Sequence, residues 1–236
     1  RICLGLLLTL DFFVRMTQAA SLYSGQGVLP LESLQQLPQQ PWSWFWSVCV
    51  FSDRVEWIYF CCGVGIISSF LMAMGWRSRW MAVISLVFLH SIQARNPWTN
   101  YGGDKLLFLL LLWACFLPLG QWFAWNKNSE SIKVGKPMAL SCWAGWGLRL
   151  QVCVMYLFSV LRKQGDAWLD GSGLHYALEI DQFALPAAVW LKTLPDSLLR
   201  GLTWLTLLVE WGAPWLLLAR GTLLRLVGIG LLVVLQ

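Results

Sequence analysis

The residue types best suited to chemistry lie between residues 156 and 171, where two cations precede two acids. Arg162 and Lys163 end an apolar run, and Asp166 and Asp170 follow directly. A lysine that is partly desolvated beside another cation has a lowered pKa and can act as a general base. The alternative is that both cations only extend toward the membrane interface while their stems stay in lipid. Lys163 is therefore the candidate base of this segment.

A second polar group follows the third apolar run. His90 precedes Arg95 by about one helical turn, and Asn96 and Asp104 come next in the chain. Two interpretations stay open. Asp104 can cap the next helix, and His90 can be a hydrogen-bonded interior histidine. Alternatively, these side chains line a pocket together with Arg95 and Asn96.

A third polar element lies inside the first apolar run. Asp11 and Arg15 are four residues apart, so a helix places both on one face. Because a charge in the membrane interior is costly, we expect this pair to face the interior of a helix bundle. It is either a packing ion pair or part of a site.

The elements that must position these residues are membrane helices. Apolar residues make up 58% of the chain and charged residues 12%, about half the charged fraction of a typical soluble domain. The mean hydropathy is +0.60. Charges cluster between long apolar runs, and 17 Trp favour membrane interfaces. The sequence predicts an integral membrane protein.

We predict an all-α fold, a polytopic transmembrane bundle of about seven helices, because isolated strands cannot satisfy their backbone in lipid. Residues 170–194 are predicted to form a short amphipathic helix on the outer surface, broken at Pro186. A single domain over 1–236 is expected, truncated at both ends because the chain starts at Arg1 and stops inside an apolar run. The apolar segments cover 2–23, 55–75, 79–95, 105–124, 139–162, 201–219 and 222–236.

The charges of the links predict an orientation. The links 76–80, 125–138 and 219–225 are basic, and the links between them are mixed or acidic. By the positive-inside rule, the N-terminus and the basic links are cytoplasmic. The loops that carry the polar motifs then lie on the extracytoplasmic side.

Several classes of site are not predicted. No basic patch interleaved with surface aromatics indicates nucleic-acid binding. Neither of the two histidines stands in a metal-ligand pattern, so we expect no metal site. No CxxC motif occurs among the seven cysteines, which we interpret as small buried hydrophobes.

The polar motifs resemble a known family in an ordered set that spans nearly the whole chain. The chain resembles the horizontally transferred transmembrane domain proteins, which are bacterial relatives of the vitamin K-dependent gamma-glutamyl carboxylase. The resemblance implies a bacterial inner-membrane location. The matching pieces are 23–30, 95–97 with 102–104, 117–120 and, most strongly, 156–171.

The resemblance also implies a chemistry. In the carboxylase, a lysine base deprotonates vitamin K hydroquinone, oxygen adds, and the strong base that results removes a glutamate gamma proton before carbon dioxide attacks. Spacing within the strongest piece places that base at Lys163, with Arg162 as a neighbouring cation and Trp168 beside them. The implied cofactors are reduced vitamin K or menaquinol, with oxygen and carbon dioxide. The implied partners are a quinone and a peptide or protein substrate, besides the lipid bilayer.

Two functional hypotheses follow. The first is a membrane enzyme that uses a reduced quinone at a pocket formed by Lys163 and the surrounding polar residues. The second is a non-enzymatic membrane module that binds lipid, quinone or a partner protein, because each polar residue also has a structural interpretation. The candidate pocket residues are Arg162, His90, Arg95, Asn96, Asp104, Asp166, Trp168 and Asp170.

Overall fold

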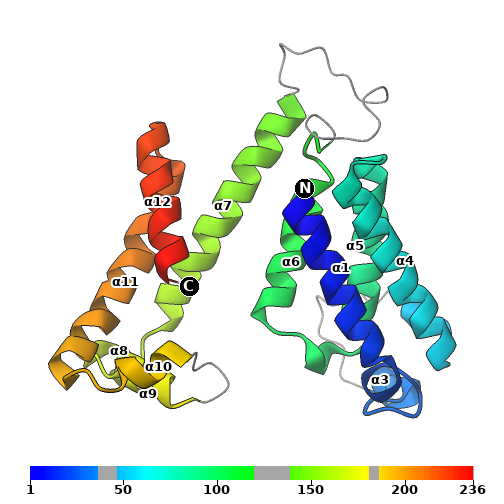
Figure 1. Cartoon of the computed structure of the whole chain (residues 1–236), viewed down its shortest axis with the longest axis horizontal. Helices are drawn as coiled ribbons and strands as arrows, with labels where there is room; N and C mark the ends of the chain where they lie inside the picture. The colour runs from blue at the N-terminus through cyan, green and yellow to red at the C-terminus, as the bar shows by residue number, and fades with distance from the viewer. Residues whose placement is uncertain (37–46, 120–138, 181–185, 236) are drawn as a thin grey trace. The chain divides into compact units, whose positions relative to one another are not determined.

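The computed structural model describes residues 1–36, 47–119, 139–180 and 186–235. Within these ranges the chain forms twelve α-helices, two short 3-10 helices and no strand, which confirms the predicted all-α class. By packing, it divides into two compact units, Arg1–Gly145 and Trp146–Gln236. Figure 1 shows the helices of both units, and each unit is described by itself.

The first unit is built around α4, which packs against α1 on one side and α5 on the other, while α5 also packs against α6. Leu8 and Phe12 of α1 are fully buried in its core. The elements of this unit are α1 (Ile2–Thr17), α2 (Ala19–Leu22), α3 (Leu31–Gln36), η1 (Val48–Val50), α4 (Val55–Met74), α5 (Ser78–Arg95), η2 (Pro97–Thr99) and α6 (Gly102–Ala114).

Small residues bring α1 and α4 together. A Cβ added at Gly5 would lie 2.8 Å from Ala73 Cβ and 2.8 Å from the carbonyl oxygen of Ser69. A Cβ added at Gly65 would lie 2.5 Å from the ring of Phe12. Small residues at such crossings let the helix backbones approach closely, which is the usual packing mode in membranes.

The link between α4 and α5 is short because its backbone turns sharply. Gly75 ends α4 in the left-handed conformation, with φ 89°, and satisfies two carbonyls of the last turn. Arg77 also has a positive φ, of 42°, directly before α5 begins at Ser78. The basic link predicted at 76–80 is therefore a tight turn between two helices, and its residues from Ser78 on already belong to α5.

The second unit contains a helix pair, α11 and α12, and a set of short helices near the start of α11. Cys153 of α7 is buried against Ala213 and Leu217 of α11, and its Sγ donates to the carbonyl oxygen of Pro214 at 3.2 Å. Pro214 lies inside α11. The elements are α7 (Ala139–Arg162), which belongs to this unit from Trp146 onward, α8 (Asp166–Leu169), α9 (Gly173–Glu179), α10 (Pro186–Leu191), α11 (Asp196–Leu218) and α12 (Thr222–Leu235).

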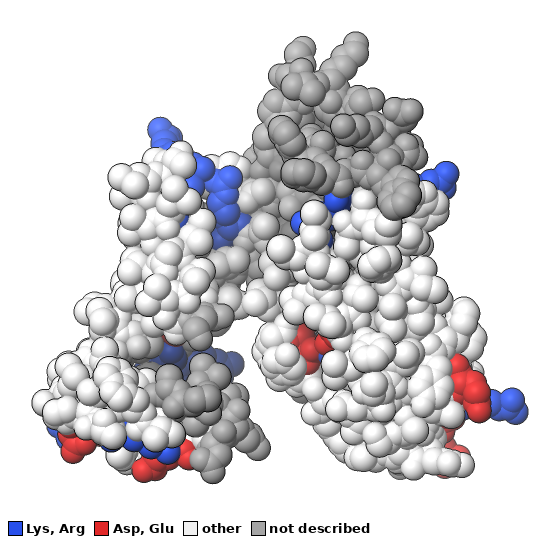
Figure 2. Space-filling model, viewed as in Figure 1, with Lys and Arg blue, Asp and Glu red and all other residues white. Residues whose placement is uncertain are grey.

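Three of the described helices are long and apolar enough to cross a membrane. They are Val55–Met74, Trp143–Arg162 within α7, and Asp196–Leu218, and the shorter Thr222–Leu235 is also apolar. Figure 2 shows that the visible face of the second unit is mostly uncharged between its two ends, where Lys, Arg, Asp and Glu gather. This distribution matches a helical membrane bundle. Because α1 and α6 have 16 and 13 residues, the count of seven crossings stays a prediction.

Most predicted helix limits agree with the structure, and the differences have local causes. The run 2–23 is interrupted at Gln18, where α1 ends and α2 begins. The fourth predicted segment, 105–124, corresponds to α6, which begins at Gly102. It ends early, at Ala114, ahead of Pro118, which lacks an N–H for a helical bond. The sixth predicted segment, 201–219, corresponds to α11, which begins earlier than predicted, at Asp196, directly after Pro195.

The predicted surface helix is instead a series of short helices. Residues 170–180 hold α9, and Pro186 begins α10 rather than only ending a helix, because proline fits the first helical turn. Residues 181–185, the basic link 125–138 and the end of the predicted segment 105–124 lie outside the described residues. The predicted orientation stays a prediction.

Candidate functional site

Lys163 pairs with an acid from a distant part of the chain. Its Nζ donates to both carboxylate oxygens of Glu210, each at 2.7 Å. The two side chains are 18% and 10% exposed. Glu210 lies in α11, and Lys163 follows the last residue of α7, so the ion pair joins these two helices. Because both groups are largely removed from water, the pair is stronger than a surface salt bridge.

Two further side chains complete this polar cluster. The hydroxyl of Ser159, one turn before Lys163, donates to Glu210 at 3.3 Å. The ammonium of Lys163 lies 4.5 Å from the ring centroid of Trp168 in α8, a cation–π contact. The ammonium therefore contacts a carboxylate and an indole ring, and the hydroxyl bonds to the same carboxylate. We name Ser159, Lys163, Trp168 and Glu210 the lysine cluster.

The other predicted residues of this segment lie outside the lysine cluster. Arg162 and Asp166 are exposed, and Asp166 opens α8. Asp170 is exposed and accepts hydrogen bonds from the N–H and the hydroxyl of Ser172, at 2.8 and 2.6 Å. The Ser172 hydroxyl is the main cause that lowers the pKa of Asp170 below its usual value. Of the five predicted residues in 162–170, the structure brings together Lys163 and Trp168.

The first unit contains a separate buried cluster around Arg15. Its Nε donates to Asp11 at 2.8 Å, and its Nη2 donates to Asp104 at 2.5 Å. Its Nη1 donates to the hydroxyl of Tyr23 at 3.0 Å. Asp104 also accepts from the N–H of Tyr101 at 2.9 Å, so it caps the start of α6 and pairs with Arg15. The Asp11–Arg15 pair faces the interior, as predicted for charges in lipid.

Arg95 and Asn96 anchor the loops at one end of the first unit. The side chain of Arg95 is 0% exposed, and its guanidinium binds Asp53 at 2.6 Å and the carbonyl of Leu29 at 2.8 Å. The amide of Asn96 donates to the carbonyl of Leu22 at 2.7 Å. Both side chains thus bind the segments before α4 to the end of α5. This is a structural role, and the predicted pocket role of both residues stays a prediction.

His90 is half-buried on α5. Its ring lies 5.7 Å from the ring of Phe108 in α6, with the planes tilted by 48°. The residue therefore packs at the α5–α6 contact. The predicted group of His90, Arg95, Asn96 and Asp104 lies in the first unit and the lysine cluster in the second, so the structure divides the predicted pocket residues between two units.

Sequence reasoning missed Glu210. It is the single acidic residue of the apolar run 201–219. A lone carboxylate inside a membrane helix indicates a buried partner or a site, and this signal was available. Asp53, the partner of Arg95, was missed because it lies in a mixed-charge link where an acid is unremarkable. Among the described residues, no three His, Cys, Asp or Glu side chains gather as metal ligands would.

The comparisons place these helices in a family. The family model described as lipase maturation factor transmembrane domain matches residues 1–236. The chain belongs to the lipase maturation factor transmembrane domain family. Comparison with curated proteins and with solved structures gave no match.

Membership in the lipase maturation factor transmembrane domain family confirms the predicted class of protein. An integral membrane protein was predicted, and both the family and the apolar helices bear this out. The more specific resemblance to the bacterial carboxylase relatives stays a prediction, as do the quinone and the bacterial inner membrane. The family name adds what sequence reasoning did not reach, a link to the maturation of a lipase.

Proposed function

We propose that this chain is the membrane domain through which a lipase maturation factor helps a lipase reach its active form. The observation that carries this proposal is the family match over residues 1–236. The partner in this proposal is a protein, the lipase. The domain contributes a membrane anchor and a surface that the lipase meets outside the hydrocarbon region.

The short helices of the second unit support this proposal because they supply such a surface. α8, α9 and α10 lie outside the segments that are long enough to cross a membrane. They nevertheless expose large apolar side chains, with Leu169 69%, Tyr176 56% and Trp190 68% exposed. Exposed apolar side chains that gather outside a core mark contact sites for proteins or lipid.

Co-expression tests the proposal. The full-length protein is expressed with a lipase in cells from which the resident maturation factor has been deleted, and lipase activity per amount of lipase is measured. We expect the wild type to raise this specific activity. The double variant Tyr176→Ser, Trp190→Ser is expected to raise it less at equal protein level. A matched control is Phe13→Ser, Leu10→Ser, which changes exposed apolar residues on α1. Wild-type protein that leaves the specific activity unchanged would refute the proposal.

The lysine cluster favours a second candidate function, quinol chemistry with Lys163 as the base. Lys163 is largely buried and lies between an aromatic ring and a carboxylate. In this mechanism Lys163 serves as a base once its ammonium has given a proton to the carboxylate of Glu210. The 2.7 Å contact supplies a direct path for that transfer. Neutral Lys163 would then take the hydroxyl proton of a bound hydroquinone.

Epoxide formation tests this second candidate. Purified protein in nanodiscs is supplied with vitamin K hydroquinone or menaquinol and oxygen. If Lys163 is the base, wild type forms epoxide, while Lys163→Ala and Glu210→Gln form little. Arg162→Ala is the matched control because it removes the exposed neighbouring cation. Absence of epoxide from folded, quinol-binding wild type excludes this chemistry and leaves the maturation proposal untouched.

A further inference from the structure

A surface hollow of about 120 Å³ lies in the second unit, between α9 and the first turns of α11. This volume lies below the range of about 300–1,000 Å³ found for sites that enclose a whole small molecule, so the hollow holds only part of a larger ligand. None of its residues takes part in the lysine cluster. It is lined by Gly171, Ser172, His175, Asp196, Leu199 and Arg200.

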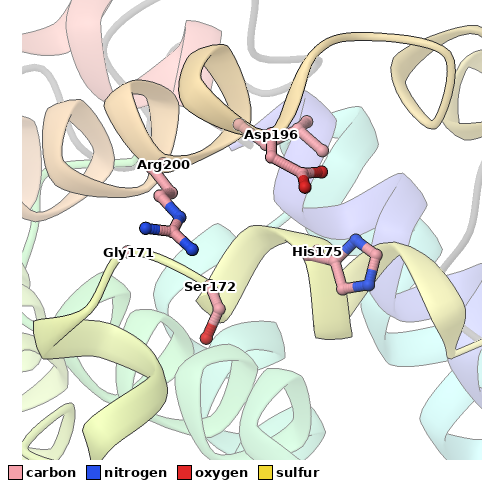
Figure 3. A pocket seen from close by; sticks show the side chains of 6 residues that line it. Gly171, Ser172, His175, Asp196 and Arg200 are labelled. Atoms are coloured by element: carbon pink, nitrogen blue, oxygen red, sulfur yellow. The ribbon is translucent and has the colours of Figure 1, made fainter.

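Two opposite charges of α11 line this hollow without pairing with each other. Asp196 and Arg200 are one helical turn apart, a spacing at which an acid and a base often bond. Among the described residues, no hydrogen bond or ion pair engages either side chain, and Arg200 attracts Asp170 electrostatically. Figure 3 shows both side chains projecting from α11 toward the segment that carries Ser172 and His175.

The neighbouring polar groups leave Arg200 as the anion-binding group. The hydroxyl hydrogen of Ser172 is donated to Asp170 at 2.6 Å, and a hydroxyl so engaged has none left for an anion. Nε2 of His175 lies 3.5 Å from Glu179. Gly171 holds a φ of 83°, and the space of its absent side chain is filled by Arg200, whose Cβ would lie 2.9 Å from an added Cβ. The base of the Arg200 side chain is therefore fixed against the loop.

An apolar stripe continues from Arg200 along α11. Its members follow at intervals of three or four residues, which places them on the same helix face as Arg200. α11 is long enough to span the bilayer, and such a crossing would put the hollow at the depth of the headgroups and the stripe along the acyl chains. The members and their exposed fractions are Trp204 48%, Leu208 68%, Trp211 48% and Trp215 54%.

We propose that the hollow binds the headgroup of a zwitterionic phospholipid. Arg200 binds the phosphate, because a guanidinium fork matches phosphate oxygens in pairs. Asp196 binds the ammonium group, and an acyl chain lies along the stripe from Trp204 to Trp215. An anionic lipid fits less well because Asp170 and Asp196 add negative charge beside Arg200. A soluble phosphate would gain nothing from the stripe.

Lipid binding to the purified full chain in detergent tests the proposal by native mass spectrometry. The probes are phosphatidylcholine and phosphatidylglycerol with identical acyl chains. We expect wild type to prefer phosphatidylcholine. Arg200→Gln weakens both lipids by about tenfold, whereas Asp196→Asn weakens phosphatidylcholine and leaves phosphatidylglycerol unchanged or tighter. Asp196→Glu keeps the wild-type preference.

The matched controls are Arg54→Gln and Glu56→Gln, which change an exposed cation and acid at the start of α4. Both controls should bind the two lipids as wild type does. Three results would overturn the proposal: Arg200→Gln that binds like Arg54→Gln, Asp196→Asn that weakens both lipids equally, or displacement of phosphatidylcholine by inorganic phosphate. The last result would indicate a site for a soluble anion.

Discussion

Nζ of Lys163 lies 2.7 Å from each carboxylate oxygen of Glu210, across 47 residues of sequence. The contact joins the end of α7 to the middle of α11, so a charge pair links two helices that are long enough to span a membrane. Helix α7 contacts α11 again at Cys153, whose thiol donates to the carbonyl oxygen of Pro214. The lysine cluster thus has a structural role whatever chemistry it performs.

Removing one partner of this pair should destabilise the second unit. Glu210→Gln leaves the Lys163 ammonium without its counter-charge, at a cost of about 3 kcal/mol. Lys163→Met has a similar effect, because it leaves the carboxylate unpaired. The double variant Lys163→Met, Glu210→Leu should lose less than the sum of the two single effects. Unfolding by denaturant in detergent micelles measures all three.

Arg162→Gln is the control for this double-mutant cycle of Lys163 and Glu210, since Arg162 is exposed and directly precedes Lys163. Its effect should stay within about 0.5 kcal/mol. Additive losses in the double variant would contradict the ion pair seen here.

Two glycines of α4 should respond differently to alanine. Gly65 faces the buried ring of Phe12, and an added Cβ would lie 2.5 Å from it. Since Phe12 is 0% exposed and cannot turn away, Gly65→Ala should cost about 1–3 kcal/mol. Gly63 has no atom within 4 Å of the added Cβ. Gly63→Ala should therefore be neutral or stabilising by up to about 1 kcal/mol, and equal thermal stability of the two variants would contradict the packing of α1 on α4.

Arg95→Lys should loosen the loops before α4. A lysine carries the same charge but cannot bind Leu29 and Asp53 at once with the geometry of a guanidinium fork. The expected loss in free energy of unfolding is about 2 kcal/mol, the scale of a hydrogen bond to a charged group. Limited proteolysis within residues 24–54 gives the readout. Arg54→Lys, at the exposed start of α4, should leave the cleavage rate at the wild-type value.

Ser172→Ala should raise the pKa of Asp170. In the folded protein this pKa is lowered, mainly by the hydrogen bond from the Ser172 hydroxyl. A lowered carboxyl pKa contributes stability that is present above the unfolded value of about 3.9 and is lost as the pH falls through the folded value. Ser172→Ala should therefore move this loss of stability toward higher pH. Carbon NMR of labelled aspartate carboxyls follows the titration, and Ser172→Thr, which keeps the hydroxyl, should titrate like wild type.

The sequence predicted those parts of the fold that depend on local pattern. The limits of α4 and α7 agreed with prediction because a left-handed glycine at Gly75 and the cations at Arg162 and Lys163 stand where the apolar runs end. α6 ended early because Pro118 interrupts a run that is apolar on both sides. Hydropathy alone does not register the missing N–H of one proline.

The candidate site was less predictable because its contacts are long-range. Sequence reasoning placed Lys163 beside Asp166 and Asp170, which are near in the chain, yet its partner is Glu210. Asp104 illustrates the opposite case. Capping and lining a pocket were the predicted alternatives. The structure shows the cap and adds an ion pair that was not predicted, with one carboxylate oxygen on Tyr101 and the other on Arg15. Neither result follows from spacing alone.

Pro214 gives α11 a point of low bending stiffness. Proline has no N–H, so the carbonyl four residues earlier, that of Glu210, loses its bond within the helix. The residue whose side chain is tied to α7 is therefore also the residue where the backbone of α11 bends most easily. The ion pair to α7 and the missing backbone hydrogen bond therefore fall on the same residue of α11.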